Sequence, residues 1–131
     1  MLLVKTRLEA SKIHGVGVFL LEPIKKGQAV TDDDPRAQIK FTPEEIEELP
    51  EALYLFIEDY AWPSAPDRDE YILTIDNEKY MNHSAQPNVD QNGYAMRDIA
   101  IGEELTINYG GIDHRFEDEN FEHTNFELED E

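Results

Sequence analysis

Short apolar runs, separated by glycine and proline turns, limit most strongly what this chain can fold into. Strand-like runs occupy Leu2–Arg7, Val16–Leu21, Gln28–Thr31, Tyr71–Ile75, Tyr94–Asp98 and Leu105–Asn108. Helical spacing of apolar residues appears in one segment, between Ile46 and Tyr60. The sequence therefore predicts a mainly β domain with a short helical insert.

The helical segment has a well-marked beginning. Thr42 is placed as an N-cap, Pro43 occupies the first helical position, and Glu45 completes a capping box. Pro50 interrupts the pattern, so we expect a short turn followed by a second helix. The segment from Trp62 to Asp67 is expected to be a loop.

Acidic residues dominate the composition. The 131 residues contain 11 Lys and Arg against 30 Asp and Glu, a net charge of −19. The charge is uneven, because residues 1–30 carry five basic and two acidic side chains while the remainder is strongly acidic. Such a field repels nucleic acid and attracts basic partners, although solubility alone would explain it equally well. We expect no direct binding to nucleic acid.

Length and residue usage indicate one folded domain. The absence of cysteine excludes disulfides, thiolate zinc sites and a cysteine nucleophile. We see no signal peptide or membrane span and expect an intracellular, cytoplasmic protein. The folded unit is assigned to residues 1–115, with an insert at about 36–75. Residues 116–131 form an acidic tail whose phenylalanines suggest partial docking.

Two segments, Tyr80–Val89 and Ile101–Gly110, combine polar and aromatic groups with apolar neighbours. Buried polar groups need partners, so these segments are candidates for a site. Asn82 and His83 suit hydrogen bonding, either to a ligand or within a loop. A metal site is disfavoured because the histidines lack ligand spacing, and the Gly-x-Ser-x-Gly motif of a serine nucleophile is absent.

Two further features allow more than one interpretation. Gly15-Val16-Gly17 permits close backbone approach to a ligand, but a hairpin turn explains it as well. It lacks the Gly-Lys-Ser/Thr of a phosphate loop. Tyr109 follows a predicted strand, so its hydroxyl either faces a site or lies in water at the edge of the core.

Together these segments resemble the SET domain of protein lysine methyltransferases. The resemblance rests on Gly15–Phe19 with its Gly-x-Gly, on Asn-His-Ser at 82–84 with Pro-Asn at 87–88, and on Gly-Glu-Glu-Leu-Thr at 102–106 followed by Tyr109. The cysteine-rich flanks of many members are absent, as in minimal bacterial and viral SET proteins. The resemblance implies several small sheets with a pseudoknot-like threading of the two C-terminal motifs.

The resemblance also implies a reaction and its residues. S-adenosylmethionine would be the methyl donor and a lysine side chain the acceptor. The backbone of Gly15, Val16 and Gly17 would contact the donor, with Asn82 and His83 holding its amino-acid and adenine parts. Tyr109 would be the catalytic tyrosine, with its hydroxyl at the point of methyl transfer.

The acidic surface favours a basic protein substrate, such as a histone, a histone-like protein or a ribosomal protein, in the nucleus if the cell is eukaryotic. Candidates for the lysine channel are Tyr60, Trp62, Tyr71, Tyr80, Ile107 and Phe116. The wall normally supplied by cysteine-rich flanks would come from the tail or from a second subunit of a homodimer. The alternatives are a SET-fold module that binds basic peptides without turnover, and an acidic metal-binding protein.

Overall fold

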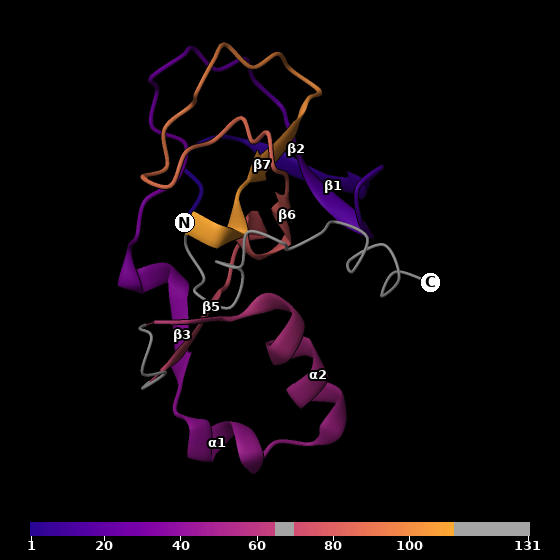
Figure 1. The fold of residues 1–131 in the computed structure, drawn as a ribbon, viewed down its shortest axis with the longest axis vertical. Helices are drawn as coiled ribbons and strands as arrows, with labels where there is room; N and C mark the ends of the chain where they lie inside the picture. The colour runs from indigo at the N-terminus through magenta and orange to yellow at the C-terminus, as the bar shows by residue number, and fades with distance from the viewer. Residues whose placement is uncertain (65–69, 112–131) are drawn as a thin grey trace.

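The computed structural model describes residues 1–64 and 70–111. Seven short strands are present in this part: β1 Thr6–Ala10, β2 Val16–Leu20, β3 Gln38–Phe41, β4 Trp62–Pro63, β5 Tyr71–Thr74, β6 Asn82–His83 and β7 Glu104–Ile107. The helices are α1 Pro43–Glu47 and α2 Glu51–Tyr60, with 3-10 turns η1 Pro35–Ala37, η2 Asn77–Tyr80 and η3 Tyr109–Gly111. In Figure 1 the helices and the β3–β5 strands form the lower half, and the remaining strands form the upper half.

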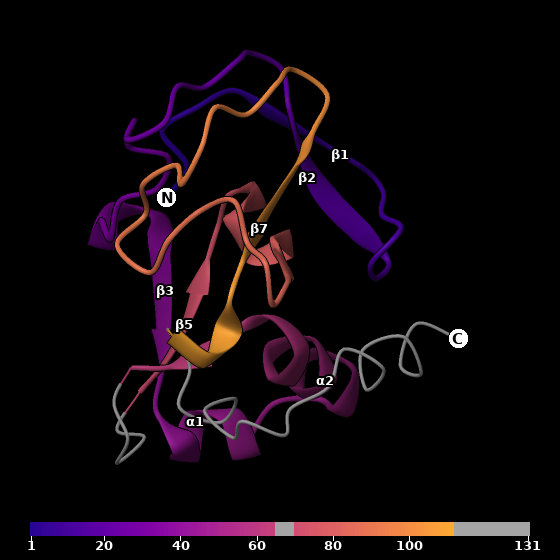
Figure 2. The same cartoon turned by 45° about the horizontal axis from the view of Figure 1, so that its top comes forward.

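The larger sheet has the strand order β1-β2-β7-β6. β1 and β2 form an antiparallel hairpin, and β7 pairs antiparallel with β2 through Val18↔Leu105. β6 pairs parallel with β7, opposite Thr106 and Ile107. The two C-terminal motifs therefore run side by side, and β7 lies between β2 and β6 in the sheet. Figure 2 shows β7 next to β2 of the N-terminal hairpin.

The main hydrophobic core lies under this sheet. Its fully buried members include Val18, Leu20 and Leu105, each with no exposed surface. Residues from the loops complete it: Ile24, Val30, Met81, Val89, Ala95 and Ile99. Burying one such aliphatic side chain contributes about 1.5–3 kcal/mol, so this cluster fixes the position of β7 against β2.

The insert forms a separate layer with its own small core. Its sheet has the order β3-β5-β4, and α1 begins with the predicted capping box. Thr42 Oγ1 accepts from the Glu45 amide at 3.2 Å, and the Glu45 carboxylate accepts from the Thr42 amide at 2.8 Å. The buried residues are Ile46, Ile57, Ala61 and Leu73. Neither described helix has the length and apolar character needed to span a membrane.

The structure confirms the main sequence predictions. The fold is mainly β with a helical insert, and Pro50 separates α1 from α2. Strands are present at Val16–Leu20, Tyr71–Thr74 and Glu104–Ile107, close to the predicted ranges. The acidic tail, including Phe116, lies outside the described residues.

Four of the predicted elements were wrong. The segments at 28–31 and 94–98 contribute isolated bridges, Ala29↔Tyr94 and Val89↔Ala95, rather than strands. Gly93, with φ of +89°, turns the chain there and prevents a continuous ladder. The first strand starts at Thr6 instead of Leu2, and Trp62 belongs to a two-residue strand instead of a loop.

Candidate active site

The predicted site segments meet where β6 and β7 run past the end of the β1–β2 hairpin. Asn82 lies opposite Thr106 in the parallel pair, and the chain continues from β7 directly to Tyr109. The hairpin loop, defined as residues 11–17 and so including the first two residues of β2, contacts Asn82 from the other side. All six residues predicted for donor binding and catalysis therefore belong to three adjoining segments.

Asn82 is the link between β6 and the hairpin loop. Its side chain is buried, and its amide nitrogen has three acceptors. These are the carbonyl of His14 at 3.0 Å, the carbonyl of Val16 at 3.1 Å, and Glu104 Oε2 at 2.8 Å. The amide thus holds the loop rather than standing alone in the core.

The hairpin loop is a folded turn with most of its carbonyls engaged. Gly15 has φ of +44°, a conformation that favours glycine. Its carbonyl accepts from the Ser11 amide at 2.8 Å, and the carbonyls on either side accept from Asn82. These bonds hold the loop in one shape against β6.

His83 is buried and fixes the start of η3. Its Nδ1 accepts from the backbone amide of Tyr109 at 2.9 Å. Because this bond uses the Nδ1 lone pair, the proton of the neutral ring is on Nε2. The histidine is thereby oriented by the segment that carries the tyrosine.

Tyr109 lies beside His83, with ring centroids 5.3 Å apart. Its hydroxyl donates to the carbonyl of Met81 at 2.6 Å. The phenol is therefore anchored to the residue that immediately precedes β6, and it is bonded to protein rather than to water alone. This bond fixes the hydroxyl close to the Asn-His motif.

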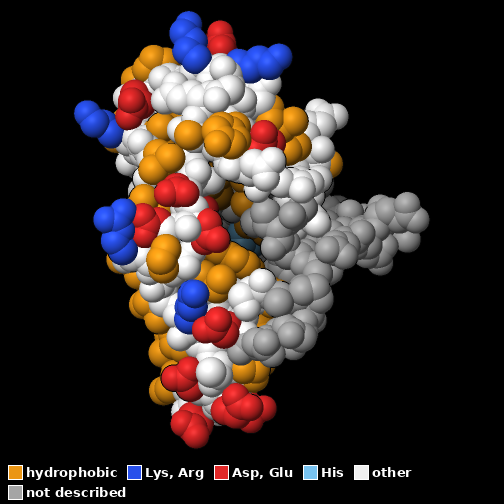
Figure 3. All heavy atoms as spheres, turned by 90° about the vertical axis from the view of Figure 1, so that its left-hand side faces the viewer, with side chains coloured by type: hydrophobic (Ala, Val, Ile, Leu, Met, Phe, Trp, Pro, Cys, Tyr) orange, Lys and Arg blue, Asp and Glu red, His pale blue; other side chains and the backbone are white. Residues whose placement is uncertain are grey.

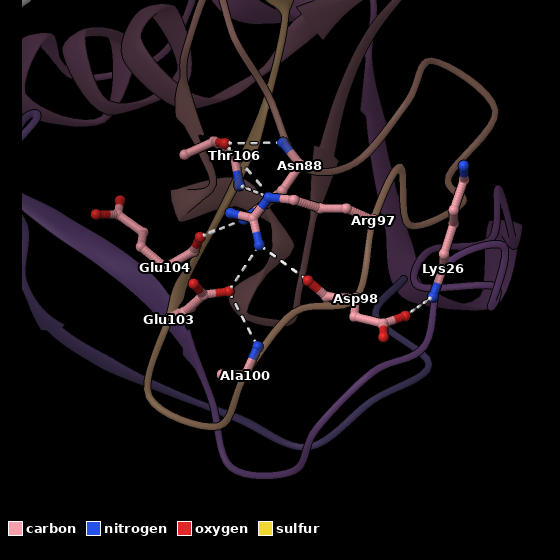
Figure 4. A network of polar contacts seen from close by, with 8 residues as sticks. All are labelled: Lys26, Asn88, Arg97, Asp98, Ala100, Glu103, Glu104 and Thr106. Atoms are coloured by element: carbon pink, nitrogen blue, oxygen red, sulfur yellow. Dashed lines mark hydrogen bonds and ion pairs between the residues drawn. The ribbon is translucent and has the colours of Figure 1, made fainter.

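Asn88 is a structural residue to which sequence reasoning assigned no role. It is buried, and its amide brackets β7: Nδ2 donates to the carbonyl of Glu104 at 2.8 Å, and Oδ1 accepts from the Thr106 amide at 2.9 Å. Figure 4 shows this contact beside the surface network of Arg97 and Glu103. The Pro-Asn pair of the motif was the available signal, because a buried asparagine needs partners.

Of the channel candidates, the structure brings two rings together. Tyr60 at the end of α2 and Tyr80 at the end of η2 pack edge to face, with centroids 5.0 Å apart. Tyr71 packs on the core of the insert, and Ile107 packs on the main core. Trp62 is half-buried in β4, and Phe116 lies outside the described residues.

Acidic side chains are concentrated on the helical insert. Residues 43–60 carry seven carboxylates and no basic side chain. Acidic side chains gather at the lower end in Figure 3, whereas acidic and basic side chains are interspersed over the rest of that face. Burial raises the pKa of Asp59, with the charge of Glu58 adding to the effect and that of His14 opposing it.

Among residues 1–64 and 70–111, no group of three His, Asp or Glu side chains is placed to hold a metal ion.

Comparison with known proteins identifies the family to which this fold belongs. A sequence profile described as the SET domain matches residues 15–110, which span all three motifs. The chain therefore belongs to the SET domain family. No curated protein matches it in sequence.

Solved structures show the same fold. A candidate histone methyltransferase of Plasmodium falciparum is 24% identical with a TM-score of 0.56, over 81% of this chain and 93% of that one. Polycomb Repressive Complex 2 of Chaetomium thermophilum, as a humanised mutant bound to an inhibitor, is 19% identical with a TM-score of 0.57. That match covers 82% of this chain but 15% of the other. At these identities the likeness establishes the fold.

Proposed function

We propose that this protein is an S-adenosylmethionine-dependent protein lysine N-methyltransferase. The observation that carries the proposal is the convergence of the hairpin loop, Asn82-His83 and Tyr109 in a SET-domain chain. Histone methyltransferases among the structures with this fold support the same reaction class.

The donor-binding role falls on the loop and on β6. The backbone of Gly15, Val16 and Gly17 would contact the donor, and Asn82 and His83 would hold its polar ends. The site residues fit this role because both side chains are buried and each is oriented by a hydrogen bond to a neighbouring segment of the site. The donor itself supplies an electrophilic methyl group on a sulfonium.

The acceptor must be a neutral amine, and lysine in water has a pKa near 10.4. Desolvation beside aromatic rings lowers that pKa, as does a nearby positive charge. Tyr60 and Tyr80 would provide an aromatic wall, and the Tyr109 hydroxyl would lie at the point of transfer. The protein's contribution is then alignment and exclusion of water.

The substrate is proposed to be a basic protein segment of the histone-like or ribosomal kind. The seven carboxylates on residues 43–60 support this choice, because they would attract and orient a cationic chain. These groups are proposed to lie around the channel entrance rather than inside it, since an internal carboxylate would keep the lysine protonated.

A labelled-methyl assay tests the reaction. Wild type, Tyr109→Phe and the control Tyr94→Phe are incubated with labelled S-adenosylmethionine and either histones or ribosomal proteins. We expect Tyr109→Phe to lose about 100-fold in rate, while Tyr94, an exposed tyrosine, tolerates the change. The lost hydroxyl bond costs about 1 kcal/mol, so the variant should still fold.

Equal incorporation by wild type and Tyr109→Phe would refute the assigned role. The binding-module alternative predicts a different pattern: capture of basic peptides without methyl incorporation, and no rise in melting temperature at saturating donor. A wild-type thermal shift with S-adenosylmethionine therefore separates the two functions before any variant is made.

A further inference from the structure

The Glu104 carboxylate joins β7 to the two other segments of the site, the hairpin loop and β6. It begins β7, yet its side chain reaches the hairpin loop and Asn82 of β6. We infer that Glu104 is a positioning residue that holds the loop of residues 11–17 in the shape required for donor binding. The role in donor binding rests on the proposed function, whereas the contacts themselves do not.

The hydrogen bonds of Glu104 form a continuous chain to the loop. Ser11 Oγ donates to the carboxylate, 2.8 Å from Oε1 and 3.0 Å from Oε2. The same Ser11 oxygen accepts from the amide of Ile13 at 2.9 Å, which closes the turn. Asn82 Nδ2 donates to Oε2 at 2.8 Å. Hydrogen bonds to an ionised acceptor are about twice as strong as neutral ones.

Gly17 provides a second, independent observation. A Cβ added there would lie against Glu104 Oε2, 2.6 Å from its Cδ, and 3.1 Å from the Cβ of Ser11. The carboxylate thus occupies the space that any other residue at 17 would need. The second glycine of the Gly-x-Gly motif therefore serves Glu104 packing, beyond the backbone approach expected from the sequence.

The carboxylate also determines which end of the Asn82 amide faces the loop. A carboxylate accepts hydrogen bonds but donates none, and so do the two loop carbonyls. All three therefore require the amide nitrogen on this side. Asn82 is then held in one orientation before any ligand arrives, which lowers the ordering cost of binding.

The neighbouring Glu103 is a matched control. Its carboxylate accepts from Arg97 Nη1 and from the Ala100 amide, each at 3.0 Å, within a surface turn. In Figure 4 the Glu104 side chain extends away from this network. The two glutamates are neighbours at the beginning of β7 and carry the same charge, but only Glu104 contacts the hairpin loop and Asn82.

Calorimetric titration with S-adenosylmethionine tests the donor-binding role. We expect Glu104→Ala to weaken donor binding by about tenfold or more, from loss of charge-assisted bonds. Glu104→Gln should lose less, because it keeps the size and one acceptor oxygen, and Glu103→Gln should bind like wild type. At saturating donor the methylation rate of Glu104→Ala should fall far less than its donor affinity.

Wild-type affinity in folded Glu104→Ala, well below its melting temperature, would overturn the inference. A merely structural role predicts that result, with a lowered melting temperature alone. Failure of wild type itself to bind the donor would instead refute the proposed function. The packing of Glu104 against the hairpin loop does not depend on the donor, and a double-mutant cycle tests it. The cycle compares Gly17→Ala, Glu104→Ala and the double variant with wild type.

The cycle measures melting temperatures without any ligand. Gly17→Ala should be destabilising in the presence of Glu104, because the added methyl group would push the carboxylate away from its hydrogen bonds to Ser11 and Asn82. Removing that carboxylate relieves the clash. The double variant should therefore lower the melting temperature by less than the sum of the decreases in the two single variants. Strictly additive losses would show that Glu104 does not pack against the loop, and the positioning role would be wrong.

Discussion

The larger sheet and the helical insert differ in how much of their apolar side-chain surface is buried. The core under the larger sheet has nine buried residues, and the strands are linked by partly buried amide and carboxylate contacts. Among the described residues, the core cluster of the insert has four buried members, and α2 exposes Leu53, Tyr54 and Leu55 at 39–51% of their surface. The candidate active site lies in the densely packed part, whereas the insert presents an acidic surface with apolar side chains.

The largest expected contrast is between one leucine in each region. Leu105→Ala removes a side chain with no exposed surface from the main core, and should cost about 3 kcal/mol in the free energy of unfolding. Leu55→Ala, at 51% exposure on α2, should change it by less than about 0.5 kcal/mol. Urea denaturation followed by circular dichroism measures both. Similar losses would contradict the difference in packing.

A smaller effect is expected at the start of the insert. Thr42→Ala breaks the capping box of α1 and should cost about 1 kcal/mol, while Thr42→Ser keeps the hydroxyl and most of the stability. Hydrogen exchange should show the loss of protection in α1, with β2 and β7 unchanged. Loss of protection throughout would show that the two regions unfold as one unit.

The smallest effect concerns the surface turn before β7. The pKa of Glu103 is lowered by its bond to the Ala100 amide, and Arg97 adds to this. A lowered carboxyl pKa stabilises the fold at a pH above the ordinary value and loses that contribution as the pH falls through the lowered pKa. Glu103→Gln should therefore cost less than about 1 kcal/mol at neutral pH.

This cost should disappear in acid, where wild-type Glu103 is also protonated. Unfolding titrations of both proteins at neutral and acidic pH measure the difference. Because the Glu103 side chain is 40% exposed, added salt should reduce the neutral-pH difference. A cost that persists unchanged in acid would mean that the charge contributes nothing.

The sequence predicted the elements whose local pattern and tertiary context agree. Val16–Leu20 and Glu104–Ile107 contain β-branched and apolar residues that the core buries, and the Thr42 cap is formed locally. β3 was missed although Gln38–Phe41 alternates polar and apolar residues, because the run is only four residues long and its pairing with β5 supplies the strand conformation. Edge strands of this kind depend on partners that a local pattern does not contain.

The sequence predicted some residues of the candidate site and missed others. Asn82, His83 and Tyr109 were identified through the family resemblance, and their contacts place them together. Glu104 was part of a motif but carried no predicted role, since a glutamate pair after a glycine turn suggests an exposed surface. Its partly buried position depends on Ser11 and Gly17, which lie far away in the sequence.

The position of β7 has a consequence for the time course of folding. β2 is synthesised early, yet its partner on the inner side is the last strand of the described chain. Until residues 104–107 leave the ribosome, Val18 and Leu20 lack the strand that covers them. Pairing between such distant segments is intrinsically slow, and the waiting hairpin exposes an unpaired, apolar edge that favours aggregation. Nascent chains of this protein should therefore depend on chaperones until β7 is inserted.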